Sequence, residues 1–240
     1  MAIYVISDLH GMAPEELQTL LRQADFTEDD WLYILGDAID RRGDGGVAML
    51  RYLLLQPNIQ LILGNHEAML LACRYLFDEV TEDSIANLSI QKMSLLNQYL
   101  QNGGEVTLRT LRALYRTDPD TVADIFEYLQ EAPLYEAISV RGHSYILTHG
   151  GMENFRPDRA LSSYSADELL WGRPAFSQQY FSKATVVLGH TPTFLYGEDF
   201  RGKILFRPSW IDIDVGLCEG CAPVLLRLDD LQTFTLSAQS

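Results

Sequence analysis

Short apolar runs, polar loops and helical patterns alternate over the first part of the chain. The apolar runs Ile3–Ile6, Trp31–Leu35 and Gln60–Leu63 have the length of buried strands. Between them, apolar residues recur at helical spacing after Pro14 and from Gly45 to Leu55. This repetition of strand, polar loop and helix predicts a parallel sheet. The loops of such a sheet gather at the carboxyl ends of its strands, where ligands bind.

The pattern changes after the third strand. Leu, Tyr, Met and Phe recur at helical spacing from 68 to 132, and breaks at Asn102–Gly104 and near Pro119 divide this segment into four expected helices. The strands expected after it are Tyr135–Val140, Tyr145–Leu147 and Ala184–Leu188. Short apolar pieces then predict an antiparallel meander in a second sheet, formed by Lys203–Phe206, Ile211–Ile213 and Pro223–Leu228.

Polar side chains follow five of these strands directly. They are Asp8 with His10, Asp37, Asn65 with His66, His149, and His190. One such ending is ordinary loop chemistry, but four of the five histidines in the chain lie at these positions. Carboxylates, amide oxygens and imidazoles suit divalent cations such as Mn²⁺, Fe²⁺ or Zn²⁺. The set exceeds the needs of one four-coordinate ion, so we expect two ions that share a carboxylate, with Asp37 as the bridge.

The neighbours Asn65 and His66 are expected to have separate functions. Asn65 can offer a neutral carbonyl oxygen to a hard cation, whereas His66 can carry a proton near neutral pH. Two adjacent metal ions are the arrangement that proteins use for in-line displacement at phosphorus. The pattern therefore indicates a metal site combined with an acid at the same edge of the sheet.

Composition narrows the class of protein. The net charge of −15 and the pI near 4.6 argue against a surface that binds nucleic acid. The chain shows neither a basic leader nor a long apolar segment, so we expect a soluble cytoplasmic protein with no membrane contact. Cys73, Cys218 and Cys221 are too few for a disulfide framework, and we expect the last two to be reduced thiols in a loop. The oligomeric state is not defined by the sequence.

Five motifs occur in order along the chain. They are Ser7-Asp8-Leu9-His10-Gly11, Gly36-Asp37-Ala38-Ile39-Asp40-Arg41, Gly64-Asn65-His66-Glu67, Thr148-His149-Gly150-Gly151 and Gly189-His190-Thr191-Pro192. Together they resemble the motifs of the calcineurin-like metallophosphoesterases, especially the phosphoprotein phosphatase branch. Trp171-Gly172-Arg173 and Leu100–Glu105 are similar to segments of the small bacterial and bacteriophage-lambda-type serine/threonine phosphatases. The resemblance covers residues 7 to about 216, nearly the whole chain.

This resemblance implies an α/β fold in which two β-sheets pack face to face between outer helices, in four layers (αββα). It implies a single domain over residues 1–240, with a helical insertion at 68–132 that walls the active site. It also implies two divalent metal ions, with manganese preferred and iron or zinc as alternatives. One ion would be bound by Asp8, His10 and Asp37, and the other by Asp37, Asn65, His149 and His190.

The resemblance also assigns expected catalytic roles. His66 would be the general acid that protonates the departing alkoxide, and Asp40 would orient its imidazole and keep it protonated. Arg41 and Arg173 would bind the phosphoryl oxygens beside Asn65 and stabilise the charge of the transition state. A hydroxide that bridges the metals would attack phosphorus directly. The implied substrate is a phosphoserine or phosphothreonine of a protein, with phosphotyrosine and small aryl phosphates as further candidates.

Two other functions are compatible with the same motifs. A symmetric dinucleoside tetraphosphate hydrolase would use the same centre to cleave an anhydride, although the modest basic content near the motifs disfavours a long polyphosphate. A non-catalytic module would bind phosphorylated partners without releasing phosphate. The presence of every ligand, the acid and the arginines argues against this module.

Some residues depart from the family pattern or have only structural expectations. Arg42 replaces the glycine that usually follows the phosphate-binding arginine, so Arg41 and Arg42 could compete for the phosphate. We expect Asp214 to be structural, Glu67 to support its turn or cap a helix, and His143 to be a solvated turn residue.

Overall fold

Three parallel strands form the centre of the first sheet. The computed structural model describes residues 1–78 and 89–236, and in it β1 (Ile3–Ile6), β2 (Trp31–Leu35) and β3 (Ile59–Ile62) are parallel neighbours. The antiparallel strands β9 (Val224–Arg227) and β10 (Thr233–Thr235) extend this sheet on the β1 side, which gives the order β10-β9-β1-β2-β3. The predicted parallel arrangement of the first three strands is therefore confirmed.

The second sheet also has five strands, in the order β4-β5-β6-β8-β7. Its elements are β4 (Tyr135–Val140), β5 (His143–Thr148), β6 (Ala184–Leu188), β7 (Leu205–Phe206) and β8 (Trp210–Asp212). The strands β4 and β5 form an antiparallel hairpin, whereas β5, β6 and β8 are parallel. The expected position of His143 in the hairpin turn is wrong, because it is the first residue of β5 and its Nε2 lies 2.8 Å from Thr185 Oγ1.

The expected antiparallel meander at the end of the chain is confirmed only in part, because β7 and β8 pair antiparallel but β9 does not join their sheet. The strand β8 pairs in parallel with β6, and β9 leaves the second sheet and pairs with β1 of the first. Burial explains why β9 is internal: Leu225 packs among the outer helices while Leu226 packs between the sheets, and both are fully buried. A strand that is apolar on both faces requires cover on both sides, which a solvated meander does not offer.

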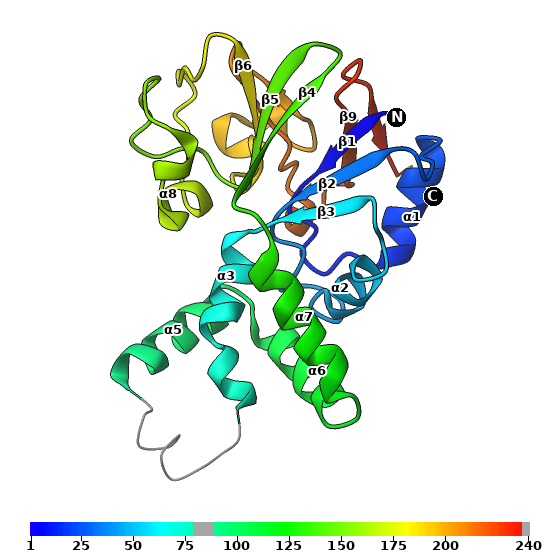
Figure 1. The fold of residues 1–240 in the computed structure, drawn as a ribbon, viewed down its shortest axis with the longest axis vertical. Coiled ribbons are helices and arrows are strands. Elements are labelled where there is room, and N and C mark those ends of the chain that lie inside the picture. The colour runs from blue at the N-terminus through cyan, green and yellow to red at the C-terminus, as the bar shows by residue number, and fades with distance from the viewer. Residues whose placement is uncertain (79–88, 237–240) are drawn as a thin grey trace.

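Helices lie outside the two sheets, and those between residues 90 and 131 extend below the sheets in Figure 1. The helices are α1 (Pro14–Gln23), α2 (Val47–Leu53), α3 (Asn65–Ala72), α5 (Ile90–Gln101), α6 (Glu105–Tyr115), α7 (Pro119–Glu131) and α8 (Ala166–Leu170). Short 3₁₀ helices span Arg74–Phe77, Leu161–Ser163, Thr193–Tyr196, Glu198–Phe200 and Leu217–Glu219. Residues 79–88 of the expected helical segment lie outside the described part of the chain.

Two helix starts differ from expectation. The helix α2 begins at Val47, not at Gly45, because Gly45 and Gly46 have φ angles of 76° and 78° in the left-handed region. The helix α3 begins at Asn65, so Asn65 and His66 lie on its first turn and not on a strand-edge loop.

Three apolar clusters define the layers of the fold. One packs the helices α1, α2, α3 and α5 to α7 against the first sheet, and another lies on the outer face of the second sheet. The middle cluster contains Val5 and Ile62 from the first sheet together with Leu147 and Val187 from the second. The sheets therefore pack face to face with helices outside, which confirms the predicted α/β sandwich.

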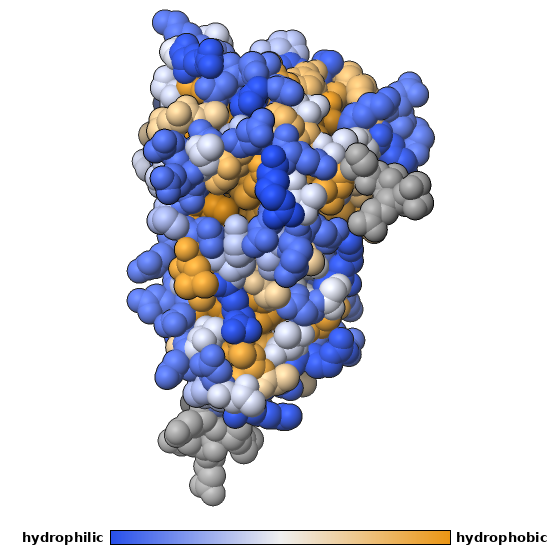
Figure 2. Space-filling model, turned by 90° about the vertical axis from the view of Figure 1, so that its right-hand side faces the viewer, coloured by the Kyte–Doolittle hydropathy of each residue, from blue (hydrophilic) through white to orange (hydrophobic). Residues whose placement is uncertain are grey.

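One face of the molecule is largely polar. Figure 2 shows a face on which hydrophilic residues predominate and hydrophobic residues appear between them in separate patches. Among the residues that the structure describes, no helix combines the length and the apolar character needed to cross a membrane.

Candidate metal centre and active site

The loops after β1, β2, β3, β5 and β6 meet at one edge of the two sheets. Backbone hydrogen bonds join them: the N–H of Asp8 donates to the Gly36 carbonyl at 3.1 Å, and that of His10 donates to the Asp37 carbonyl at 2.8 Å. The N–H of Gly189 donates to the His149 carbonyl at 2.8 Å. The loops therefore form one connected surface around a cavity of about 280 Å³.

The carboxylate of Asp37 lies between two groups of possible metal ligands. Its Oδ2 is 3.8 Å from His10 Nε2, and its Oδ1 is 3.4 Å from His149 Nε2. The first group also includes Asp8, whose Oδ1 lies 3.9 Å from His10 Nε2. In the second group, Asn65 Oδ1 lies 2.8 Å from His149 Nε2. One carboxylate oxygen of Asp37 thus faces each group.

The geometry of the donor atoms fits a divalent cation. His10, Asp37 and His66 form one cluster of candidate ligands, and Asp37, His149 and His190 form the other. The Nε2 atom of His190 is buried and has no hydrogen-bond partner among the described residues. An unpaired buried imidazole nitrogen is costly unless a ligand accepts its lone pair.

The electrostatics of the centre also favour bound cations. Burial lowers the pKa of His10 to about 3 and that of His190 to about 2, so both imidazoles are neutral and can ligate a metal. Burial, followed by the negative charges of Asp8 and Glu67, raises the pKa of Asp37 well above its usual range. Buried carboxylates in such proximity require positive charge to compensate them.

Backbone strain is concentrated at the same residues. Among the described residues, ten non-glycine residues have positive φ, and six of these belong to the expected site. These six are Asp8, His10, Asp37, Asp40, Arg41 and His190. A left-handed conformation costs about 1–3 kcal/mol for such residues and persists only where surrounding contacts enforce it.

Glu67 provides several of those contacts. Its carboxylate accepts backbone N–H groups of Asp37 at 2.9 Å, Ala38 at 2.8 Å, Ile39 at 3.3 Å and Gly64 at 3.0 Å. It therefore fastens the loop after β2 to the first turn of α3. The expectation that Glu67 supports its turn is confirmed.

His66 and Asp40 form a buried pair. The Nδ1 of His66 lies 2.6 Å from Asp40 Oδ2, as the sequence-based assignment requires. The other oxygen of Asp40, Oδ1, accepts hydrogen bonds from Tyr99 and Thr107. Burial lowers the pKa of His66 to about 3 and raises that of Asp40 to about 7.

His66 is also close enough to Asp37 to be a possible ligand, at 3.7 Å from Nε2 to Oδ2. Its surroundings argue against that role. Its Nδ1 is engaged by Asp40, and the guanidinium of Arg41 lies 3.2 Å from its Nε2. A cation at this nitrogen opposes a second cation there. His66 therefore fits proton transfer better than metal binding.

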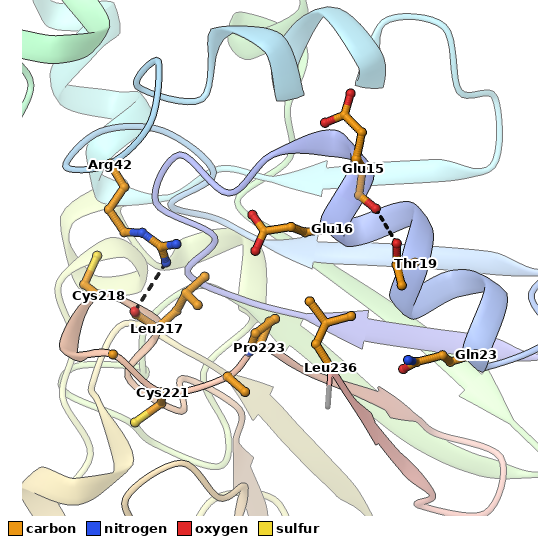
Figure 3. Close-up of a pocket in the computed structure, with 12 residues that line it drawn as sticks. Glu15, Glu16, Thr19, Gln23, Arg42, Leu217, Cys218, Cys221, Pro223 and Leu236 are labelled. Atoms are coloured by element: carbon orange, nitrogen blue, oxygen red, sulfur yellow. Dashed lines mark hydrogen bonds between the residues drawn. The ribbon is translucent and has the colours of Figure 1, made fainter. Parts of the chain in front are cut away.

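Two of the three arginines near the motifs line the cavity, and the third faces another pocket. Arg41 and Arg173 both line the cavity, and Arg173 Nη1 donates to Thr191 Oγ1 at 3.4 Å. Arg42 points into a separate pocket beside α1, where its Nη1 donates to the Leu217 carbonyl at 3.4 Å (Figure 3). Arg42 consequently does not compete with Arg41 for the cavity.

The loop of Arg173 is joined to the loop of His149. Gly151 N–H donates to the Gly172 carbonyl at 2.7 Å, which brings Arg173 to the cavity from the segment after α8. Asp214 lies at the same cavity, where its Oδ1 accepts the N–H of Gly216 at 3.0 Å.

Sequence reasoning did not find Tyr99 and Thr107 as neighbours of the site. Both lie inside the helical segment 68–132, where no strand end marks them. The nearby signal was the segment Leu100–Glu105, which separates them and resembles a phosphatase segment.

Comparison with known proteins shows the class to which this fold and these clusters of aspartate and histidine belong. A family model described as calcineurin-like phosphoesterase matches residues 1–194, and the chain belongs to this family. The family uses divalent metals, and the aspartate and histidine clusters described above are the candidate ligands here.

Curated relatives match a smaller part of the chain. The symmetrical bis(5'-nucleosyl)-tetraphosphatases of Salmonella arizonae and Salmonella typhimurium are 46% identical to it over 74 residues. This segment is 30% of the chain and 26% of each relative. The chain therefore spans about a quarter of the length of these relatives.

Two solved structures share the fold over nearly the whole chain. One is a candidate diadenosine tetraphosphatase, with a TM-score of 0.61, 19% identity, and coverage of 98% of this chain and 92% of the other. The other is a protein serine/threonine phosphatase from Saccharomyces cerevisiae that is similar to human PP5. Its TM-score is 0.57 at 16% identity, with coverage of 100% of this chain and 81% of the other.

Proposed function

We propose that this protein is a metal-dependent phosphatase that hydrolyses phosphoserine or phosphothreonine. The observation that supports this most is the position of Asp37 between two clusters of buried ligands, beside a separate acid pair and two arginines. Phosphotyrosine and small aryl phosphates are further substrates for the same centre. In this proposal, residues 68–132 are a helical insertion that walls the active site of a single domain.

The proposed ligands divide between two ions, for which manganese is preferred and iron or zinc are alternatives. Asp8, His10 and Asp37 would hold one ion, and Asp37, Asn65, His149 and His190 the other. When bound, such ions supply Lewis-acid chemistry to the phosphoryl group and lower the pKa of water. In this proposal the attacking group is a water activated by such ions, without a covalent intermediate.

Arg41 and Arg173 are the proposed phosphate-binding groups. Two guanidinium groups can donate to the phosphoryl oxygens and stabilise the charge of the transition state. Asn65 lies at the same cavity and can contact the substrate through its amide. In the structure, Arg41 lies at His66 Nε2, and we infer that a phosphoryl group draws it away from this nitrogen.

His66 is the proposed general acid. Asp40 fixes its Nδ1, which leaves Nε2 for the leaving group. Removal of the Arg41 cation and arrival of an anionic phosphoester both favour the protonated imidazole. The protonated Nε2 can then donate its proton to the departing alkoxide of serine or threonine.

Release of inorganic phosphate from a phosphoserine peptide with Mn²⁺ tests this proposal. His66→Asn is expected to keep the metal content and to slow the phosphoserine peptide strongly, but p-nitrophenyl phosphate much less, because its leaving group needs no acid. An equal loss for both substrates would refute the role of His66. Tight phosphopeptide binding without phosphate release would instead identify a non-catalytic binding module.

A symmetric dinucleoside tetraphosphate hydrolase is the second candidate. It is supported by the 46% identity to the Salmonella tetraphosphatases, although over 74 residues only. A cavity of about 280 Å³ with two arginines suits one phosphoryl group better than a chain of four. Product analysis with diadenosine tetraphosphate separates the candidates, because formation of two ADP molecules faster than phosphopeptide hydrolysis would favour the second.

A further inference from the structure

Both carboxylate oxygens of Asp40 have buried partners. Oδ2 contacts His66 Nδ1 at 2.6 Å, whereas Oδ1 accepts from Tyr99 Oη at 2.7 Å and from Thr107 Oγ1 at 2.5 Å. His66 is 1% exposed, and the other three residues are 0% exposed. Water therefore cannot replace either hydroxyl without rearrangement of the core.

Tyr99 and Thr107 belong to two helices of the segment 68–132, outside the two sheets. Tyr99 lies near the end of α5, and Thr107 lies on the first turn of α6. The turn between these helices contacts the site directly, because the Gly103 carbonyl accepts the backbone N–H of Arg41 at 3.2 Å. The turn also packs closely, since a Cβ added to Gly104 would lie 2.4 Å from the Tyr99 ring.

The distances around Thr107 Oγ1 show which group donates and which accepts each hydrogen bond. Thr107 Oγ1 lies near both Asp40 Oδ1 and the Gly45 carbonyl, at 2.5 and 3.0 Å. A hydroxyl has one proton, and the shorter, charge-assisted contact to the carboxylate takes it. With two donors on Oδ1, that oxygen carries no proton. Burial raises the pKa of Asp40 to about 7, and the bonds from Thr107 and Tyr99 oppose this rise.

The backbone conformation of Asp40 explains why its carboxylate needs these two hydrogen bonds. Its φ is 74°, and that of Arg41 is 66°, so the side chain of Asp40 extends from a strained loop. Two donors on one oxygen fix the plane of its carboxylate. The plane in turn fixes the ring of His66 through Nδ1, which holds Nε2 toward the cavity.

We propose that Tyr99 and Thr107 are positioning residues for protonation of the leaving group, acting through Asp40 and His66. This inference rests on the proposed function, in which His66 is the general acid. It gives the helical segment a second role besides forming a wall: α5 and α6 hold the acid in its working orientation. The competing explanation is that the two hydroxyls only satisfy a buried carboxylate and contribute stability.

The two explanations differ in their dependence on the leaving group. Tyr99→Phe and Thr107→Val are compared with wild type on a phosphoserine peptide and on p-nitrophenyl phosphate, both with Mn²⁺. General acid catalysis contributes about 100- to 10,000-fold, so we expect each variant to lose about tenfold on the peptide. The activated aryl phosphate should lose less than about twofold, because its leaving group needs no proton. Thr107→Ser retains the hydroxyl and should restore the peptide rate.

Matched variants separate positioning from stability. Tyr4→Phe removes another buried hydroxyl, which donates to the Ala24 carbonyl at 2.9 Å in the same apolar cluster but does not contact Asp40. Thr110→Val removes a hydroxyl that bonds to its own helix at the Val106 carbonyl. Both should keep the ratio of the two rates. In a His66→Asn background, Tyr99→Phe should cause no further loss on the peptide.

Proton NMR of the His66 Nδ1–H resonance gives a readout that does not depend on turnover. The resonance is assigned by its absence in His66→Asn. It should move in Tyr99→Phe and Thr107→Val and stay in place in Tyr4→Phe. The positioning role would be overturned by any of three results. These are an unchanged resonance, an equal rate loss for both substrates, and a further loss of peptide rate when Tyr99→Phe is added to His66→Asn. Wild type that releases phosphate from neither substrate would refute the proposed function instead, and the resonance would still decide the positioning.

Discussion

Glu67 is the residue through which stability and metal binding are most directly linked. Its Oε2 accepts the N–H groups of Asp37 and Gly64, and its Oε1 accepts those of Ala38 and Ile39. Glu67→Gln preserves the size of the side chain but replaces one of these oxygens with an NH₂ group. Two of the four buried donors then lose their acceptor and face another donor.

The cost follows from these contacts. An unpaired buried donor costs about 1–3 kcal/mol, so two of them lower the free energy of unfolding by about 2–6 kcal/mol. For a chain of this size, each kcal/mol corresponds to about 2–4 °C, and a loss near 3 kcal/mol lowers the melting temperature by about 6–12 °C. Because the released loop carries Asp37, we also expect Mn²⁺ to bind about 10- to 100-fold more weakly.

Thermal unfolding and calorimetric titration with Mn²⁺ measure the two effects. Glu16→Gln is the control, because the Glu16 carboxylate accepts a single N–H, that of Ala13 at 3.0 Å, near the surface. It should lower the free energy of unfolding by less than about 1 kcal/mol and leave metal affinity unchanged. If Glu67→Gln kept the melting temperature within about 2 °C of wild type and bound Mn²⁺ equally well, this reasoning would be refuted.

Other variants test the arginines and the acid stability. Arg41→Ala should lower kcat/KM on a phosphoserine peptide by about 100-fold or more, because it removes a charge that stabilises the transition state. Arg42→Gly should leave kcat/KM within about twofold, since Arg42 faces the other pocket; a loss equal to that of Arg41→Ala would contradict the assignment. Burial raises the pKa of Asp30, but hydrogen bonds from Ala2 and Thr27 outweigh it and lower the net value. This depressed pKa stabilises the fold above about pH 4, the ordinary range of an aspartate, and the benefit disappears as the pH falls through the lowered pKa. The melting temperatures of wild type and Asp30→Asn should therefore differ at pH 7 and converge as the solution is made strongly acidic.

The parts of the fold that follow from local pattern could be predicted. The strands β1 to β3 are short apolar runs followed by loops, and their parallel order follows from the helices between them. The position of β9 could not be predicted, because only the packed fold offers Leu225 and Leu226 two buried faces. The start of α3 at Asn65 was also missed, since three of the four backbone N–H groups that Glu67 accepts, those of Asp37, Ala38 and Ile39, lie 28 to 30 positions earlier in the chain.

The residues of the candidate site also divide into those that local sequence pattern predicts and those that only the packed fold brings together. Asp37, Asn65 and His149 could be identified because each follows an apolar strand. Tyr99 and Thr107 could not, because their relation to Asp40 spans 59 and 67 residues and depends on the turn between α5 and α6. A buried tyrosine in a helix is typical of a core, and its hydroxyl partner is visible only in three dimensions.

Metal stoichiometry tests the central claim most directly. Calorimetric titration of the metal-free wild-type protein with Mn²⁺, combined with elemental analysis, should give two ions per chain. His190→Ala should retain one tightly bound ion, whereas Asp37→Ala, which removes the shared ligand, should weaken both. A single ion in the wild-type protein, or two ions whose affinities are unaffected by Asp37→Ala, would contradict a centre built around a shared Asp37.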